Sequence, residues 1–258
     1  MSETTVSPRS VRDQVSEQEW LVRQDLAAAY RLVDYYGWTD MVFTHLSARV
    51  PGPDEHFLLN PFGFLFNEVT ASNLVKVDVD GNVVLDSGCG VNAAGFTIHS
   101  AVHMHREDAG AVMHLHTDAG VAVSSTEEGL LPLNQHAMFV YPDLAYHDWE
   151  GVALDLDERE RLVADLGQHH VMILRNHGTL ALGGSVASCF MRLYYLERAC
   201  QIQVKAAAAG TLNQPPAKAV DMMRETFNNP AAWEKSLGPT AWPALRRQAD
   251  RLDPSYAD

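Results

Sequence analysis

The chain has 258 residues, of which 47% are hydrophobic and 20% charged, as is typical of a globular protein with one large or two small domains. Its formal net charge of −14 would repel nucleic acid and anionic membranes, so we expect neither as a partner. Three widely spaced cysteines indicate a reduced compartment, and the polar N-terminus and the lack of a long apolar run predict a cytoplasmic protein.

The first third of the chain predicts a polar arm, a helix and two hairpins. Residues 1–19 are expected to form a flexible N-terminal arm. From 17 to 37 the apolar residues recur at helical spacing, and Gly37 is suited to end that helix. Alternating apolar residues and turn signals predict the strands of the hairpins, which are 41–50, 57–60 and the two halves of 74–85.

Helices and strands alternate in the rest of the chain. The expected elements are a helix over 94–108, a strand over 109–117, a helix over 119–125, strands over 169–178 and 179–184, and a helix over 185–210. Because several strands lie in hairpins while others follow helices, the sequence predicts one α/β domain over 20–212 with a mixed sheet. Residues 213–258 are expected to be a helical extension that packs on this domain or on a neighbouring subunit.

Three histidines are candidates for metal ligands. His114 and His116 are two residues apart near the end of an apolar strand, so their side chains share one face. His177 has a similar setting, because an apolar strand runs into the turn RNHG. Three imidazoles suit Zn²⁺, Mn²⁺ or Fe²⁺ with a position open for substrate. The alternative is three separate histidines that only make hydrogen bonds.

A second pair, His99 and His103, is spaced by one helical turn and shares a helix face. That spacing can bind metal, but no glutamate lies between them as in HExxH proteins. We therefore expect His99 to be buried and His103 to lie nearer to solvent.

The segments AGAVMHLHT and ILRNHGTLALGGSVASCFMRLYYLERACQIQVK resemble the class II aldolase/adducin family. The match extends through FTHLSARVP, NPFGFLFNEVTASNLVKVD and NAAGFTIHSAVHMHRED. Within the family, the sequence of these segments is most similar to the adducin head and its bacterial relatives. The resemblance implies a three-layer α/β/α fold around a largely antiparallel mixed sheet. It also implies a homotetramer with sites between subunits, and zinc held by His114, His116 and His177.

Three motifs depart from the sugar-phosphate aldolases of that family. Their Ser-Ser-Glu, with two phosphate-binding serines and an acid/base glutamate, is replaced here by Ala93, Ala94 and Gly95. Their Gly-Asn-x-Ser is Thr44 to Ser47 here, with His45 in place of the asparagine, and their Pro-Thr-Gly has become Pro61, Phe62 and Gly63. The departures predict a substrate without phosphate, with Phe62, Gly63 and Gly95 as candidate substrate-binding residues. Phe62, Phe64 and Phe66 could make the pocket more apolar, or could simply pack in the core.

The acid/base group that replaces the missing glutamate has two candidates. These are His45 and His136, and His136 lies near the position of a catalytic tyrosine of the aldolases. The resulting hypothesis is a metal-dependent carbon–carbon lyase that cleaves or decarboxylates a hydroxy, oxo or aromatic acid through an enolate. Zinc is the expected metal, with Mn²⁺ or Fe²⁺ as alternatives. A non-catalytic binding or oligomerisation module like the adducin head, and an iron oxygenase of an aromatic oxo acid, remain as alternatives.

Overall fold

The computed structural model describes residues 10–85, 87–88, 90, 93–151, 158–227 and 229–258, with side-chain surroundings given for all of these except 93–97 and 158. Residues 1–9 of the predicted N-terminal arm lie outside the described residues. A short 3-10 helix, Val11–Gln14, precedes the first long helix.

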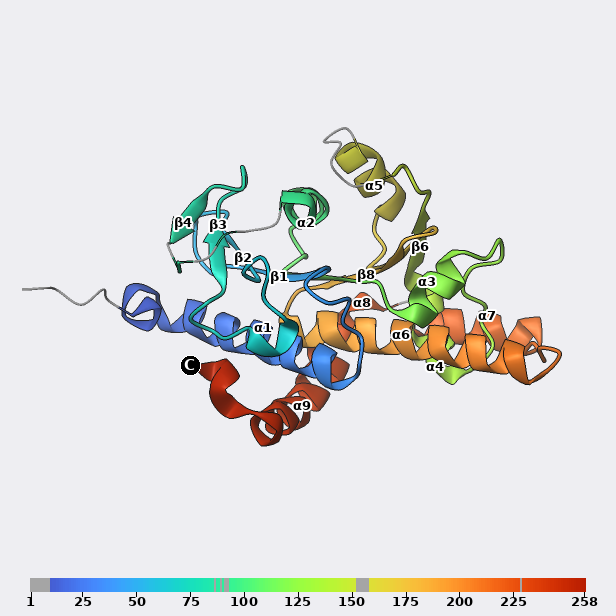
Figure 1. Ribbon diagram of the computed structural model, residues 1–258. Helices are drawn as coiled ribbons and strands as arrows, with labels where there is room; N and C mark the ends of the chain where they lie inside the picture. Colours follow the sequence, from blue (N-terminus) through green and yellow to red (C-terminus); the bar gives the residue numbers. More distant parts are fainter. Residues whose placement is uncertain (1–9, 86, 89, 91–92, 152–157, 228) are drawn as a thin grey trace, which may run out of the picture.

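Eight strands of the described residues form one sheet (Figure 1). They are β1 (His45–Arg49), β2 (Phe57–Leu59), β3 (Val75–Val77), β4 (Val83–Leu85), β5 (Ala111–Leu115), β6 (Leu144–His147), β7 (Val171–Leu174) and β8 (Gly178–Gly183). Their order across the sheet is β4-β3-β2-β1-β5-β8-β7-β6. Every neighbouring pair is antiparallel except β6 and β7, so the predicted mixed, largely antiparallel sheet is confirmed.

Helices cover both faces of this sheet. They are α1 (Glu17–Tyr35), α2 (Ala93–His105), α3 (Asp118–Ser124), α4 (Gln135–Val140), α5 (Glu158–Leu166), α6 (Val186–Ala209), α7 (Ala217–Phe227), α8 (Pro230–Ala232) and α9 (Gly238–Leu252). In Figure 1, α2 and α5 lie above the sheet while α1 and α6 lie below it. The α/β/α layering expected from the resemblance is therefore confirmed.

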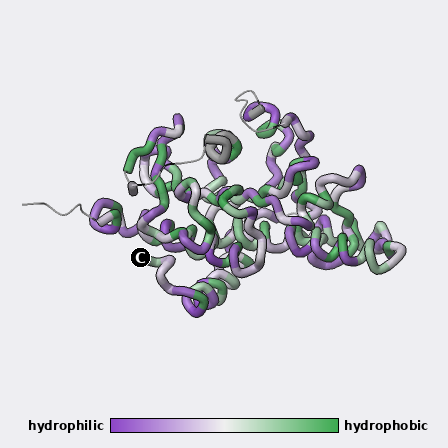
Figure 2. The backbone as a smooth tube through the Cα atoms, viewed as in Figure 1, coloured by the Kyte–Doolittle hydropathy of each residue, from purple (hydrophilic) through white to green (hydrophobic). Residues whose placement is uncertain are grey.

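Strand alternation divides the core between the two faces of the sheet. Met113 and Leu115 of β5 belong to the large apolar cluster with α1 and α6. Val112 belongs to a smaller cluster on the other face, which includes Ile98 and Val102 of α2. Because β5 is covered on both faces, all five of its residues are buried, as expected for a central strand. Along α9, hydrophilic and hydrophobic stretches alternate, in keeping with one face packed on the core (Figure 2).

The first long helix follows its sequence signals. The Ser16 side chain caps α1 by accepting a hydrogen bond from the Glu19 backbone N–H, 3.1 Å away. The helix ends at Tyr35, and Gly37 follows with φ +69°, a left-handed conformation that glycine adopts at little cost.

The predicted strand over 41–50 is partly wrong, because pairing in β1 begins only at His45. Met41 and Thr44 have positive φ angles, of 49° and 67°, which are incompatible with an extended strand. The Phe43 backbone N–H instead donates to the Asp40 carbonyl over 2.8 Å, which closes a tight turn. This turn, unlike a strand, brings the Asp40 side chain back toward the end of β5.

Several elements were not predicted from the sequence, among them α4 and β6. β6 is a short strand that pairs parallel to β7, so its register depends on a distant segment. The C-terminal helix α9 packs against α1 and α6 of the same chain, where the Trp242 indole N–H donates to Asp25 over 2.9 Å. In the described part of the chain, no helix combines the length and apolar character needed to cross a membrane.

Candidate metal centre

Three histidine rings meet at one end of the sheet. His114 lies in β5, His116 follows the end of that strand, and His177 lies in the turn between β7 and β8. One ring nitrogen from each falls within 4.8 Å of the others. The ring centroids are 4.7 to 4.8 Å apart. The structure thus brings together the three residues that the sequence singled out.

The turn that carries His177 depends on two residues of the RNHG motif. Asn176 has φ +56°, a left-handed conformation that asparagine tolerates better than most residues. At Gly178 a Cβ atom would lie 2.3 Å from the Leu115 carbonyl oxygen, so any side chain there would push β5 and β8 apart. Glycine therefore allows the close approach that places His177 beside His114 and His116.

Burial keeps two of these imidazoles neutral. The pKa of His114 lies well below its ordinary value because the ring is buried, with smaller contributions from His177 and His116. Burial, with the nearby His116 and His147, likewise lowers the pKa of His177 to about 4. A neutral imidazole has a free lone pair at pH 7, which is the form that binds a metal ion.

Hydrogen bonds orient the rings. The Nδ1 of His114 lies 2.9 Å from the Thr179 carbonyl oxygen, which can only accept, so the His114 proton is on Nδ1 and its Nε2 is bare. The Nδ1 of His116 donates to the Asp40 carboxylate over 3.0 Å. The two Nε2 atoms then face each other at 2.9 Å. Two lone pairs this close require a proton or a metal ion between them, so the donor set fits a divalent cation.

The two candidate acid/base histidines have different surroundings. His45 of β1 pairs across the sheet with His114, is 7% exposed, and has its pKa lowered to about 4 by burial and by His116. His136, at the start of α4, lies beside Tyr195 with ring centroids 6.0 Å apart. No hydrogen bond or ring contact of the described residues joins His136 to the three histidines, whereas His45 pairs with His114 across the sheet and its pKa is influenced by His116. His45 is therefore the better placed candidate.

Ser47, two residues after His45, belongs to a chain of buried hydrogen bonds. The Ser47 hydroxyl lies 2.6 Å from His99 Nδ1 and 2.7 Å from His103 Nε2. His103 is 1% exposed, so the expectation that it lies nearer to solvent is wrong. Its Nδ1 is held by the Ala109 carbonyl at 2.9 Å, and its ring stacks on Phe57. Because His103 Nδ1 donates to Ala109, His103 Nε2 must accept the single proton of the Ser47 hydroxyl. That hydroxyl therefore has no proton left to donate to a ligand.

The candidate substrate-binding residues have different surroundings. Phe62 is 52% exposed, and Gly63 follows it with φ +86°. Phe66, by contrast, is fully buried edge-on against Tyr30 in the main core, so for this residue core packing is the correct interpretation. Gly95 belongs to α2, but its surroundings lie outside what the structure describes.

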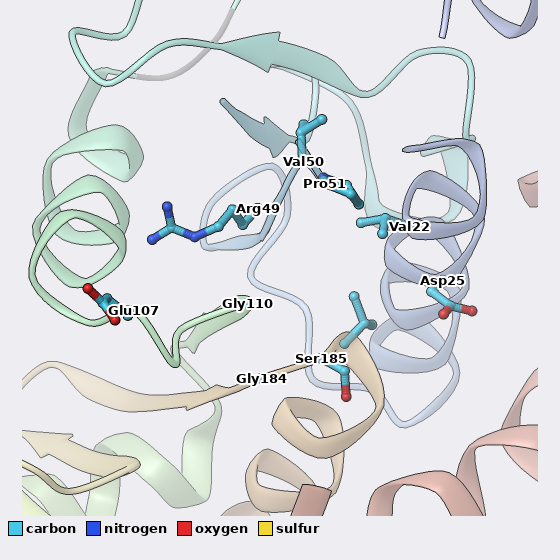
Figure 3. Close-up of a pocket in the computed structure, with 10 residues that line it drawn as sticks. Val22, Asp25, Arg49, Val50, Pro51, Glu107, Gly110, Gly184 and Ser185 are labelled. Atoms are coloured by element: carbon cyan, nitrogen blue, oxygen red, sulfur yellow. The ribbon is translucent and has the colours of Figure 1, made fainter. Parts of the chain in front are cut away.

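A cavity of about 330 Å³ lies at the opposite end of β5 and β8 (Figure 3). It is bordered by Gly110 and Gly184 in the loops at that end, with Arg49 and Glu107 on one side and Val22 on the other. The histidine cluster is at the far end of the same strands. The cavity is therefore separate from the site that the histidines form.

We predict that Asp40 increases the affinity of the histidine cluster for a metal ion. Replacing Asp40 by asparagine removes the charge that accepts the Nδ1–H of His116, while keeping the size of the side chain. Loss of such an outer partner lowers metal affinity by roughly 10- to 100-fold. We expect a decrease in this range for Asp40→Asn, measured by competition with a chromophoric chelator. Asp54→Asn, an exposed carboxylate in the turn between β1 and β2, is the matched control. Equal affinities for the two variants would show that Asp40 has no such role.

The chain is similar to proteins of known family over most of its length. The family model described as "Class II Aldolase and Adducin N-terminal domain" matches residues 24–204. A solved structure of an aldolase II superfamily protein from Pseudomonas syringae is 53% identical, with a TM-score of 0.91, over 97% of this chain and 100% of that one.

Of two further relatives, one is named as an aldolase and the other is an adducin. L-fuculose 1-phosphate aldolase from Glaciozyma antarctica is 28% identical with a TM-score of 0.81, over 98% of this chain and 97% of that one. Alpha-adducin of Mus musculus is 42% identical over 91% of this chain but only 34% of its own length. The family model covers well over half of the chain, and the histidine cluster lies within the matched region. The chain belongs to the class II aldolase and adducin N-terminal domain family.

Proposed function

We propose that this protein is a divalent-metal-dependent carbon–carbon lyase that acts on a non-phosphorylated hydroxy, oxo or aromatic acid. The observation that carries the proposal is the pair of facing Nε2 atoms of His114 and His116, 2.9 Å apart, with His177 beside them. Structural sites are usually closed by four protein ligands, whereas three histidines leave room for a reactant. Zinc is the expected ion, with Mn²⁺ or Fe²⁺ as alternatives.

Each residue of the proposed site has a separate role. His114, His116 and His177 would hold the ion, which would supply Lewis-acid stabilisation of the negative charge that develops on the substrate. Asp40 and the Thr179 carbonyl keep two of the rings in the tautomer that leaves Nε2 bare. His45, buried opposite His114, is the proposed acid/base group.

Three features support a substrate without phosphate. The Ser47 hydroxyl is already bonded to His99 and His103, so it cannot also bind a phosphate oxygen. Burial keeps His45 neutral at pH 7, since its pKa is lowered to about 4, so the ring offers no positive charge to a dianion. The replacement of two serines by Ala93 and Ala94 acts in the same direction.

The likeness to alpha-adducin supports a second candidate, a binding or oligomerisation module without catalysis. In either case we propose a homotetramer with its sites between neighbouring subunits, which analytical ultracentrifugation would test. The two candidates differ in whether a metal-loaded protein turns over any acid.

The test combines metal analysis with a substrate panel. The protein is loaded with Zn²⁺, Mn²⁺ or anaerobic Fe²⁺ and assayed for aldehyde, 2-oxo acid or CO₂ release from hydroxy, oxo and aromatic acids, with L-fuculose 1-phosphate for comparison. We expect turnover of a non-phosphorylated acid that is lost in His114→Ala. Faster cleavage of the phosphosugar would overturn the substrate class. Metal binding without any turnover would favour the binding module, and turnover that needs O₂ would favour the oxygenase.

A further inference from the structure

A buried carboxylate lies beside the chain segments that carry the histidines. Glu197 of α6 is 0% exposed, and its two oxygens accept hydrogen bonds from the hydroxyls of Thr117 and Thr179. No ion pair of the described residues includes Glu197, and burial raises its pKa to about 7. Placing an acid there costs free energy, so the group needs an explanation beyond packing.

The two threonines belong to the two segments that form the metal centre. Thr117 directly follows His116 and caps α3. Thr179 pairs with Leu115 across β5 and β8, and its carbonyl oxygen accepts the hydrogen bond from His114. One side chain on α6 is therefore bonded to both the end of β5 and the start of β8.

The Glu197, Thr117 and Thr179 side chains are closely packed against α3. Gly120 packs against the three side chains, and a Cβ atom there would lie 2.9 Å from the Thr117 hydroxyl oxygen and 3.4 Å from a Glu197 carboxylate oxygen. A change at Glu197 should thus be transmitted to the threonine backbones rather than absorbed locally.

We propose that Glu197 is a positioning residue of the metal centre, which holds the ends of β5 and β8 at the separation that brings the three imidazoles together. The proposal rests on the metal site of the proposed function, but not on its chemistry or substrate. Glu197 acts through Thr117 and Thr179 and touches none of the three ligands. Groups of this kind typically change metal affinity by roughly 10- to 100-fold.

The first experiment separates positioning from general stabilisation of α6. Gln203 is a second buried polar residue of that helix, bonded to the Leu131 N–H and the Gly129 carbonyl, away from the histidines. Co²⁺ affinity and the visible Co²⁺ spectrum are measured for Glu197→Ala, Glu197→Gln and Gln203→Ala. We expect Glu197→Ala to bind Co²⁺ at least 10-fold more weakly with an altered spectrum. Gln203→Ala should lose thermal stability but keep both properties.

The conservative variant tests the mechanism. Glutamine keeps the size and shape of the carboxyl group, and its amide can accept a hydrogen bond from one threonine hydroxyl and donate one to the other, so Glu197→Gln should recover most of the affinity. Thr179→Val should weaken Co²⁺ binding as Glu197→Ala does, and the two effects should not add. Equal affinity in Glu197→Ala, Gln203→Ala and the unmodified protein would overturn the proposal, as would full additivity.

A measurement on the metal-free protein keeps this inference distinct from the proposed function. In long-range ¹⁵N–¹H spectra of the imidazoles, His114 should be the Nδ1–H tautomer, as its bond to Thr179 requires. Glu197→Ala should mix its tautomers, while Gln203→Ala should not. If Co²⁺ does not bind at all but Glu197→Ala still mixes them, the metal function fails and the positioning role stands. An unchanged tautomer in Glu197→Ala would sink the positioning role.

Discussion

Replacing His114 or His177 by alanine is expected to abolish stoichiometric binding of the divalent metal. Each ring supplies one of three nitrogens within 4.8 Å of one another, and the two residues come from different segments, His114 from β5 and His177 from the turn between β7 and β8. Removal of an outer partner alone costs roughly 10- to 100-fold in affinity, so loss of a ligand should cost more than 100-fold. The measurement is metal content by mass spectrometry after dialysis against a weak chelator, with about one ion per chain expected for the unmodified protein.

The control for these variants is His105→Gln. His105 is exposed at the end of α2, where its Nδ1 bonds to the Ala101 carbonyl of its own helix. It should retain full metal content, which would show that the number of histidines is not what matters. Metal content that stays near one ion per chain in both His114→Ala and His177→Ala would eliminate this site.

Alanine at Gly178 is expected to damage both stability and metal binding. The added Cβ would lie 2.3 Å from the Leu115 carbonyl oxygen and 3.2 Å from the His116 ring, so β5 and β8 must separate beside two of the proposed metal ligands. Overpacking of this kind costs about 1 to 3 kcal/mol, and the upper end applies because a backbone atom must move. Urea unfolding would measure the lost stability, and chelator competition the lost metal affinity.

The same pair of strands offers a matched control at its other end. At Gly110 a Cβ atom would lie 2.3 Å from the Gly184 carbonyl oxygen, so Gly110→Ala introduces a comparable clash far from the histidines. Both variants should lose similar stability, but only Gly178→Ala should lose metal affinity. If Gly110→Ala weakened metal binding equally, the effect would be a general loss of the fold and not a local change at the site.

The histidine centre could be predicted because its signals are local. The two-residue spacing of His114 and His116 places both rings on one face of a strand, whatever surrounds it. His177 was recognised from a strand that runs into a turn with glycine. The order of hairpins and helices was likewise sufficient to predict an α/β domain with a mixed sheet, since apolar periodicity is a property of each segment alone, whereas the three-layer arrangement was expected from the family resemblance.

The partners of these histidines could not be predicted. Asp40 reaches His116 only because Met41 and Thr44 adopt left-handed backbone angles that turn an expected strand into a loop. Glu197 carries no sequence signal, since a glutamate in a helix is ordinarily exposed. His103 was expected nearer to solvent but is buried, because it bonds to Ser47 from a different element.

Amino-acid order was thus enough to predict the candidate ligands and an α/β domain with a mixed sheet, through spacing along single strands and helices. Which groups orient those ligands depended on contacts between segments up to 80 residues apart, such as Thr117 and Glu197. Such contacts form only when β5 and β8 pair and α6 packs across them. The surroundings of His45 and His136 were decided in the same way, since His45 pairs with His114 in the sheet whereas His136 lies beside Tyr195 of α6.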